Sequence, residues 1–377
     1  MAYEHFIENL IAFSPQDLPV ISLYLNAQPD ERGRHNFDVF ARKQLTERAK
    51  TYPPHTEERK SFDEDALRIS RYLEQEVAPP TQGIAIFACA GAADFFEAAQ
   101  LEVPIANNEI FVLDRPHLYP LVGLLDQHQR YAVLLADTNT ARIFVFGVGK
   151  ALTVAQLQNV KTKRSHAGGW SQMRYQRHTE NYHLHHAKEV IESLERVVLG
   201  EQIDHIVLAG DQETIIPLLR SQMPKELEEK VIDVLSLPVN TPEHEILESS
   251  LVAYRKHDAI SDKEKVEHLL NEYRAVGLGV VGVPETLAAL SNGQVEELLI
   301  SHSVANLKYQ EDEVEQVLAA YAAADSKSAK ITTEPPTVAN ELVSRAQQIS
   351  SAKITFIEDA SLLEGVGGVG ALLRYRF

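Results

Sequence analysis

The stretch YAVLLADTNTARIFVFG, residues 131–147, decides how the centre of this chain folds. Two apolar runs flank the polar residues Thr138 to Thr140, and this pattern predicts two antiparallel strands joined by a tight turn. A further apolar run, HIVLAGD at residues 205–211, precedes a helical pattern that reaches toward Pro224. With the helix that lies between them, these runs predict an α/β layer of the order strand, strand, helix, strand, helix.

Between these strands lies a basic segment, residues 161–188, with the sequence KTKRSHAGGWSQMRYQRHTENYHLHHAK. It holds six lysines or arginines against one acid, Glu180, whereas the whole chain has a formal net charge of −18. A local positive excess in an acidic chain indicates a polyanionic partner, although a solvated surface loop gives the same pattern. Gly168 and Gly169 at its centre would let the backbone approach a partner closely.

From Ser171 onward the composition predicts a long amphipathic helix that ends at Gly200. The apolar stripe expected to face the core consists of Leu184, Ala187, Ile191, Leu194 and Val198. Histidines that could in principle bind a metal also lie on this helix, namely His178, His183, His185 and His186. Because no carboxylate or fourth ligand is indicated near them, we predict no metal site and no cofactor there.

Acidic residues stand at the ends of the predicted central strands. They are Asp137, Asp204, Asp211 and Glu213. A metal-dependent nuclease collects carboxylates at such positions, so nuclease activity stays as an alternative function. Ordinary turn and capping residues give the same pattern.

Composition limits the class of protein. The chain has 377 residues, of which 44% are hydrophobic, and these are enough for two or three domains. One cysteine, Cys89, excludes a disulfide framework, and no apolar run approaches the roughly 18 residues that span a bilayer. We therefore expect a cytoplasmic protein without a membrane contact, and an RNA contact confined to the basic segment.

The flanking regions predict two further α/β units. Before residue 127, strands are expected at VISLYLNA (20–27) and GIAIFACA (83–90), with helices at about 36–50 and 63–77. An acidic helix at 261–274 leads to strands at 276–283 and 295–301, helices at 311–325 and 337–350, and a closing strand at the C-terminus. The predicted domains are thus 1–127, 128–274 and 275–377.

Two segments match the glycine spacing of dinucleotide-binding loops. The glycines are Gly277, Gly279 and Gly282 in the first copy, and Gly365, Gly367 and Gly370 in the second. The first copy falls within a predicted strand, and the second lies too close to the end of the sequence for a βαβ unit. We therefore predict turn or bulge glycines at both places.

Three segments together resemble the archaeo-eukaryotic class-one peptide release factors and their relative Pelota, and most closely the bacterial members of that family. The segments are GVGGVGALLRYRF at 365–377, GVPETLAALSNGQVEELLIS at 282–301, and HAGGWSQMRYQRHTENYHLHHAKEV at 166–190. The last of these is similar to the loop and helix that carry the family's Gly-Gly-Gln motif. Weaker similarity in the same order extends over nearly the whole chain.

The resemblance implies an N-terminal α/β domain, a middle domain with an RNase H-like fold, and a C-terminal α/β/α domain like ribosomal proteins that bind kink-turn RNA. It also implies that Gly168 and Gly169 enter the peptidyl-transferase centre of the ribosome. In this chain the next residue is Trp170, and a glutamine follows only at Gln172. The family's codon-reading signature is absent before residue 127, so stop-codon recognition is not implied.

The resulting hypothesis is a ribosome-associated factor that acts in termination, rescue or quality control. Its partners would be rRNA, peptidyl-tRNA and, as a further candidate, a translational GTPase. Hydrolysis of the peptidyl-tRNA ester is assigned to Gly168, Gly169 and Gln172. RNA contacts are assigned to Lys161, Lys163, Arg164, Trp170, Arg174 and Arg177. The alternatives are a non-catalytic RNA- or ribosome-binding module and the nuclease named above.

Overall fold

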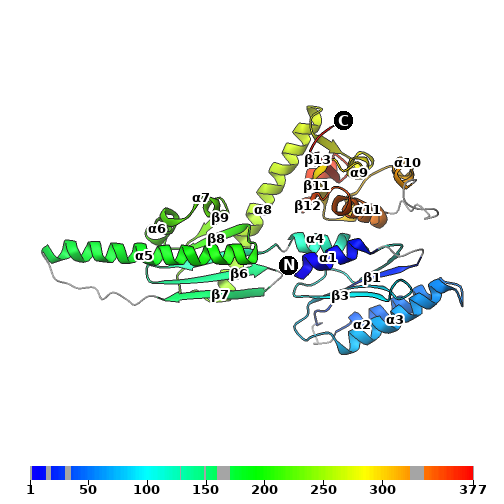
Figure 1. The fold of residues 1–377 in the computed structure, drawn as a ribbon, viewed down its shortest axis with the longest axis horizontal. Helices are drawn as coiled ribbons and strands as arrows, with labels where there is room; N and C mark the ends of the chain where they lie inside the picture. Colours follow the sequence, from blue (N-terminus) through cyan, green and yellow to red (C-terminus); the bar gives the residue numbers. More distant parts are fainter. Residues whose placement is uncertain are drawn as a thin grey trace. The chain divides into compact units, whose positions relative to one another are not determined.

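The protein is described by a computed structural model, which covers residues 2–13, 18–29, 35–127, 129–147, 150–158, 170–322 and 335–376. Within these ranges the side chains of residues 2–5, 150–158, 170–180, 322, 335 and 336 are not described. The chain forms two compact units, one made of residues 1–127 together with 262–377 and the other of residues 128–261 (Figure 1). The mixed α/β class that the sequence predicts is confirmed.

The N-terminal part of the first unit is a four-stranded antiparallel sheet. Its strands are β1 (Val20–Asn26), β2 (Gly83–Cys89), β3 (Phe95–Leu101) and β4 (Glu109–Leu113), in the order β3-β2-β1-β4. Helices α2 (Phe37–Ala49) and α3 (Glu57–Gln75) bury their apolar stripes against one face. On the other face Phe6 of α1 (Ala2–Ala12) packs against Phe87. Because both faces are covered, β1 and β2 read as continuous apolar runs.

The second unit holds a five-stranded mixed sheet. Its strands are β5 (Tyr131–Ala136), β6 (Thr140–Gly147), β7 (Lys150–Gln158), β8 (His205–Gly210) and β9 (Val231–Leu235), in the order β7-β6-β5-β8-β9. The first three are antiparallel, whereas β8 runs parallel to both β5 and β9. The predicted hairpin at 131–147 and the strand at 205–211 are confirmed.

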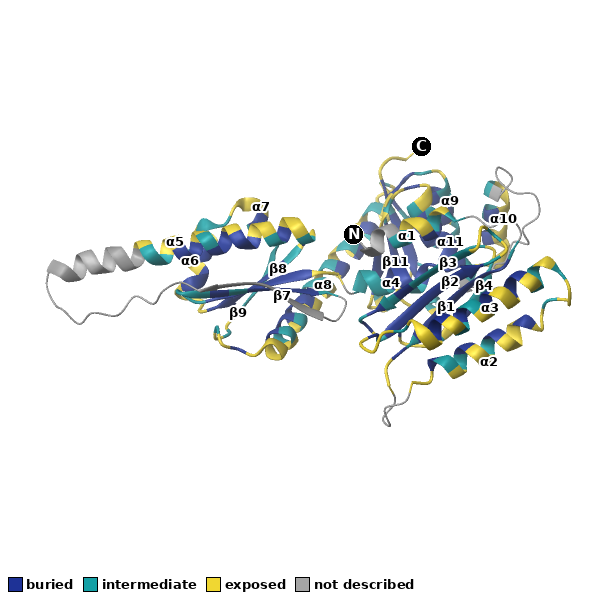
Figure 2. Cartoon of the chain, turned by 60° about the horizontal axis from the view of Figure 1, so that its bottom comes forward, coloured by how far each residue is buried: buried dark blue, intermediate teal, exposed yellow. Residues whose placement is uncertain are grey.

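Helices cover both faces of this second sheet, which appears as a dark buried layer in Figure 2. On one face lie α5 (Trp170–Glu201), α6 (Ile215–Gln222) and α7 (Lys225–Glu228), which share a core with Leu134 and Ile143. On the other face Ile246 and Tyr254, from the first half of α8 (Glu243–Arg274), pack against Val133 and neighbouring side chains. The alternation of β5 side chains between two cores explains its uninterrupted apolar sequence.

The C-terminal part of the first unit has a second four-stranded sheet. Its strands are β10 (Gly279–Val281), β11 (Val295–Ser301), β12 (Lys353–Ile357) and β13 (Val369–Leu373), in the order β10-β13-β11-β12. Its helices are α9 (Val283–Ser291), α10 (Glu311–Ala322), α11 (Pro335–Gln348) and α12 (Ser361–Glu364), with a short 3-10 turn at η1 (Val304–Asn306). The strands predicted at 276–283 and 295–301 correspond to β10 and β11, with β10 shorter than expected.

Both glycine-rich segments form turns and caps in this C-terminal part. Gly282 has φ of 90° and is the N-cap residue of α9, so it ends β10 early. Gly367 and Gly368 have φ of 78° and 81°, and a side chain at Gly368 would overlap the Asn306 carbonyl. Gly279 lies inside β10 itself, so this segment does not form a loop after a strand of the dinucleotide-binding kind. The predicted turn role is confirmed for Gly282 and Gly367, whereas Gly279 and Gly370 lie within strands β10 and β13.

The two sheets of the first unit are joined through α4 (Tyr119–Gln127), an element that the sequence did not indicate. The Asn340 side chain, buried on α11, accepts a hydrogen bond from the Leu118 amide at 2.7 Å and donates one to the Pro116 carbonyl at 3.1 Å. The Tyr119 hydroxyl donates to the carbonyl of Ser301 at the end of β11. Residues 116–119 are thus held on the C-terminal part by buried polar contacts.

Other differences from the sequence-based expectations concern the second unit. Strands β7 and β9 were not predicted, and α8 begins at Glu243 although a helix was expected only from Ser261. The second unit ends at residue 261, within α8, whereas the predicted domain boundary follows residue 274. The three predicted domain ranges, the RNase H-like middle domain and the kink-turn-type C-terminal domain stay predictions.

Candidate nucleic-acid interface

Residues 170–188 of the basic segment belong to α5, a helix of the second unit. The first part of the segment, with Lys161, Lys163, Arg164, Gly168 and Gly169, lies outside the described residues. Helix α5 begins at Trp170 and continues without interruption for 32 residues. Gln172, Arg174 and Arg177 belong to its first eight residues, and only their helical backbone is described.

The C-terminal half of α5 is anchored in the core. Five of its residues are between 0% and 4% exposed, and they are Ala187, Val190, Ile191, Leu194 and Val198. They pack against the sheet and against Ile215 and Leu219 of α6. The predicted apolar stripe is therefore confirmed from Ala187 onward. It is wrong at Leu184, which is 40% exposed because the packed core ends at His186.

His186 marks the point where α5 enters the core. Its side chain is 1% exposed, and its ring forms a hydrogen bond with the main chain of Asp137, at the end of β5. Burial lowers the pKa of His186, which favours the neutral ring. His185, one position earlier, lies on the exposed side with its Nε2 3.3 Å from Oε1 of Glu189. These two histidines point in different directions and do not form one site.

Asp137 and Asp211, two of the strand-end acids, hold the turns that follow their strands. Asp137 Oδ1 accepts hydrogen bonds from the amides of Asn139 and Thr140, both at 2.7 Å, and so closes the turn between β5 and β6. Asp211 Oδ1 accepts from the Thr214 amide at 2.8 Å and from its hydroxyl at 2.9 Å. These bonds lower the pKa of Asp211. Among the described residues no group of three or more His, Cys, Asp or Glu could hold a metal ion.

Asp204 and Glu213, the other two acids of the nuclease alternative, also have local roles. The Asp204 carboxylate lies 2.9 Å from the Lys230 ammonium group, at the opposite end of β8 from Asp211. The Glu213 amide donates a hydrogen bond to Asp211. Asp137 and Asp211 do stand at neighbouring strand ends, because Ala136 pairs with Gly210.

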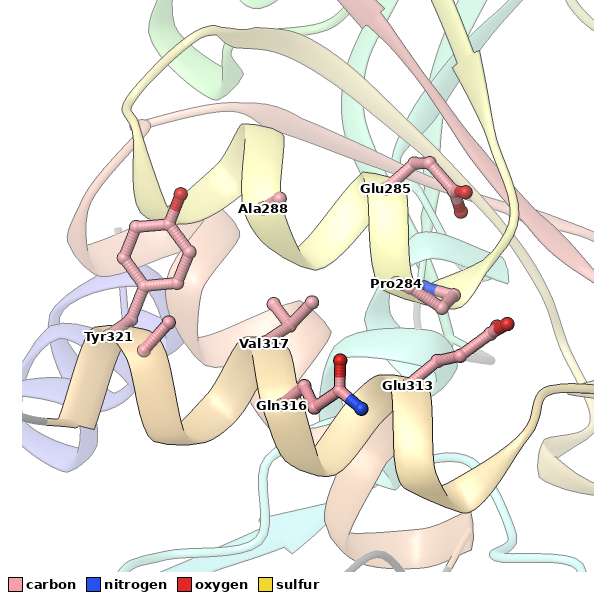
Figure 3. A pocket seen from close by; sticks show the side chains of 8 residues that line it. Pro284, Glu285, Ala288, Glu313, Gln316, Val317 and Tyr321 are labelled. Atoms are coloured by element: carbon pink, nitrogen blue, oxygen red, sulfur yellow. The ribbon is translucent and has the colours of Figure 1, made fainter.

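A groove that the sequence did not indicate lies between α9 and α10, with a volume of about 430 Å³ (Figure 3). Pro284, Ala288 and Val317 form an apolar floor, and the carboxylates of Glu285 and Glu313 stand at one end. Two carboxylates at one end of the groove would repel phosphate. The groove is therefore unsuited to the nucleic-acid contact expected of the basic segment.

Two family models match this chain, one after the other along the sequence. Residues 116–255 match the model described as bacterial archaeo-eukaryotic release factor family 10. Residues 259–377 match the model described as eRF1 domain 3. The first match covers the whole of the sheet of the second unit and helix α5, and the second covers the C-terminal sheet of the first unit.

Individual proteins agree with these matches. The chain is 24% identical over 344 residues to the peptide chain release factor subunit 1 of Pyrococcus abyssi, covering 82% of this chain and 83% of that one. It is 23% identical over 297 residues to the eukaryotic peptide chain release factor subunit 1 of Saccharomyces cerevisiae, covering 72% and 67%. Among solved structures, ribosome-bound archaeal Pelota is similar at 13% identity with a TM-score of 0.42, over 99% of this chain and 94% of that one.

No described helix is both long enough and apolar enough to cross a membrane. The two adjacent family matches and the release factors found as relatives lead to one conclusion: the chain belongs to the archaeo-eukaryotic release factor family.

Proposed function

We propose that this protein acts on the ribosome in translation termination or rescue, and that residues 161–177 promote hydrolysis of peptidyl-tRNA at the peptidyl-transferase centre. Membership of the release factor family supports the general role. The local positive charge of residues 161–177 supports a contact with RNA phosphates, because the chain as a whole is strongly acidic. A translational GTPase is proposed as a second partner.

The anchoring of α5 is the observation that carries this proposal. From His186 onward the helix is fixed by the core, and its backbone runs unbroken to Trp170, the residue directly after Gly168 and Gly169. At 1.5 Å per residue, Trp170 is about 24 Å along the helix from His186. A helix that is anchored from His186 onward and continues for this length before it is a suitable support for a glycine pair that must reach into a narrow RNA cavity.

The proposed chemistry is hydrolysis of an ester. Water attacks the carbonyl carbon of the peptidyl ester, the bond to the tRNA 3′ oxygen breaks, and that oxygen takes up a proton. Without side chains, Gly168 and Gly169 can bring backbone amides close to the developing oxyanion. Gln172, in the first turn of α5, has both a donor and an acceptor and could orient the attacking water.

A peptidyl-tRNA release assay on programmed ribosomes tests this mechanism. Gly169→Ala should abolish release while ribosome binding changes little, because the new methyl group blocks the close approach of the backbone. Gln172→Ala should lower the rate by a smaller factor. If the wild type releases no peptide from stalled or vacant ribosomes that it demonstrably binds, the hydrolytic proposal is wrong.

One observation favours a non-catalytic, site-occupying protein as the second candidate. Helix α5 starts at Trp170, the position where the family's motif has its glutamine. An indole has one donor and no acceptor, but its flat face can stack on a base. For an occupant, Trp170→Ala should abolish ribosome binding and Gln172→Ala should have no effect.

The charged residues of the segment have their own test. Replacing Lys161, Lys163, Arg164, Arg174 and Arg177 by alanine should weaken ribosome co-sedimentation and flatten its dependence on salt. Exchanging five exposed cations outside residues 161–188, namely Lys60, Arg71, Lys225, Arg255 and Lys263, gives a control with the same change of charge. Equal ribosome binding by the two variants would return the segment to the reading of a solvated loop.

The nuclease alternative receives less support. Asp137 and Asp211 each hold the turn that follows their strand, which accounts for their positions at the strand ends. RNA cleavage that requires Mg²⁺ or Mn²⁺ and is lost in Asp211→Asn would restore this alternative.

A further inference from the structure

Two segments far apart in the sequence form one exposed surface in the C-terminal part of the first unit. One is the end of α8 and the turn after it, and the other is the end of the chain after β13. The exposed side chains of this surface, which we call the tyrosine-arginine patch, are Tyr273, Arg274, Val276, Leu278, Arg374, Tyr375 and Arg376. It lies outside residues 161–177 and has no role in the function proposed above.

Main-chain contacts hold the two segments together. Gly279 pairs with Leu372 in the sheet, and the Leu373 amide donates to the Leu278 carbonyl at 2.8 Å. Arg376 Nη1 donates to the Gly277 carbonyl at 3.0 Å. Arg374 Nη2 donates to the carbonyl of Ser351, a residue outside the two segments, at 3.2 Å. Each of these guanidinium groups keeps further N–H donors for a ligand, because an arginine has five.

The turn after α8 has an unusual residue at its centre. The Val276 amide donates to the Tyr273 carbonyl, and the Gly277 amide donates to the Glu272 carbonyl, which is the hydrogen-bond pattern of a Schellman cap. In this cap the residue with positive φ is usually glycine, yet here it is Val276, with φ of 54° and a side chain 73% exposed. A β-branched residue in this conformation is strained, and such strain is concentrated at functional sites.

The charge of the patch is opposite to that of the protein. Residues 271–278 and 373–376 contain three arginines and one acid, Glu272, in a chain of net charge −18. The Glu272 carboxylate is half-buried, and its Oε2 accepts a hydrogen bond from the Leu278 amide at 2.9 Å. The outer surface of the patch is therefore positive.

Two aromatic rings accompany these cations. Tyr273 is 48% exposed and Tyr375 is 44% exposed, and the apolar side chains of Val276 and Leu278 on the turn after α8 are 73% and 40% exposed. Exposed rings beside arginines are the combination that binds unpaired nucleotides, with bases stacked on the rings and phosphates held by the guanidinium groups. An acidic peptide would use the arginines but would gain little from the rings.

We infer that the tyrosine-arginine patch binds a short single-stranded RNA segment. The three arginines contact phosphates, and Tyr273 and Tyr375 stack on bases, with Val276 as an apolar contact between them. The site accepts unpaired bases of any sequence, because stacking requires only their flat faces. RNA hairpins without exposed bases bind it less well.

The test measures binding of a fluorescent 12-nucleotide single-stranded RNA to the full-length protein at low salt. The basic segment would contribute its own RNA binding, so the measurement uses the variant in which Lys161, Lys163, Arg164, Arg174 and Arg177 are alanine. In this background, Arg274→Gln with Arg374→Gln and Arg376→Gln should weaken binding at least tenfold. It should also lower the slope of log K against log salt by about 2, from three phosphate contacts.

The tyrosines distinguish RNA from an acidic peptide. Tyr273→Ala and Tyr375→Ala should each weaken RNA binding at least about fivefold, the lower limit for loss of one stacked base. A 4-thiouridine-containing RNA should cross-link to the peptides that hold these two residues. If a hexaglutamate peptide binds as tightly as RNA, or if the tyrosine variants bind RNA like their parent, the assignment to RNA is wrong.

A matched control removes three positive charges from positions outside the tyrosine-arginine patch. Arg71, Arg220 and Arg255 are exposed and lie elsewhere on the protein, and their exchange for glutamine should leave RNA binding within about twofold. Equal weakening by the control and by the patch variant would show a general electrostatic effect and overturn the proposal. Because the probe is free RNA, this result does not depend on whether the protein hydrolyses peptidyl-tRNA.

Discussion

Asp65 on α3 is a carboxyl group that the fold has placed out of contact with water. It is 0% exposed, and its Oδ1 accepts a hydrogen bond from the Ala90 amide at 2.9 Å. Its Oδ2 is buried without a hydrogen-bond partner among the described residues. Burial raises the pKa of Asp65 to about 7, and the Ala90 amide and Arg68 oppose the shift only in part.

This raised pKa predicts a dependence of stability on pH. The folded state holds the Asp65 proton more tightly than the unfolded state, so this group makes the protein less stable as pH rises from about 4 to about 7. Asp65→Asn should remove that loss. The unfolding free energy of the variant minus that of the wild type should therefore be higher at pH 8 than at pH 5, by on the order of a few kcal/mol. Urea unfolding at the two pH values measures the difference.

The exposed neighbour Asp63 provides the control, because Asp63→Asn should change stability equally at both pH values. If Asp65→Asn also showed the same effect at pH 5 and pH 8, the carboxyl group would not be titrating in this range.

Gly368 gives a second prediction at the residue scale. Its φ is 81°, and a Cβ atom there would overlap the carbonyl oxygen of Asn306. Gly368→Ala should therefore lower the free energy of unfolding by about 2 kcal/mol or more. Gly365, three residues earlier, has φ of −67° and no atom within 4 Å of an added Cβ, so Gly365→Ala should have little effect. Thermal melting of the two variants compares them directly.

At the scale of elements, α5 depends on its buried half. Leu194 is 0% exposed in the core of the second unit, and Leu194→Ala should cost about 2 to 5 kcal/mol of unfolding free energy. Leu199 on the same helix is 73% exposed, and Leu199→Ala should cost less than about 0.5 kcal/mol. Circular dichroism during urea unfolding follows both. Equal costs would mean that α5 is not anchored in the way described.

The elements that could be predicted were those with one clear pattern. Strands β5, β6 and β8 are buried on both faces and read as continuous apolar runs. Strand β9 is a half-buried edge strand of five residues, with Asp233 at its centre, and gives no such signal. Helix α8 was recognised only in its second half, because its core contacts change along its length. Ile246 and Tyr254 pack in one core, whereas Val266 and Leu269 pack in another, which breaks the periodicity.

The candidate sites also differ in how far they could be predicted from the sequence. The excess of positive charge made residues 161–188 visible in the sequence, and the helix that follows was predicted from its stripe. The burial of His186 could not be predicted, because it stands in a run of histidines and its neighbour Asp137 lies at the end of β5, about 50 positions earlier. The tyrosine-arginine patch combines residues about 100 positions apart, which only the pairing of β10 with β13 brings together.

At the scale of the whole molecule, Asn340 should control the stability of one unit and not the other. Asn340→Ala leaves the Leu118 amide and the Pro116 carbonyl buried without their partner. The unit of residues 1–127 and 262–377 should lose about 2 to 6 kcal/mol, since each of the two groups left without a partner costs about 1 to 3 kcal/mol. Hydrogen exchange should rise across β1, β2 and α11 but stay unchanged in β5, β6 and β8. Exposed Asn271→Ala is the matched control.

The first unit is made of two separate chain segments, residues 1–127 and 262–377, and this limits the order in which a growing chain can fold. The amide of Phe356 donates to Asp126 at 2.8 Å, although the two residues are separated by 230 positions. At synthesis rates of about 5 to 20 residues per second, α4 waits roughly 10 to 50 s for its partner to be made. The segment from 128 to 261 emerges entirely within that interval and can complete its own core first. Until residues 301–356 have been made, the contact groups on residues 116–119 and on α4 lack their partners.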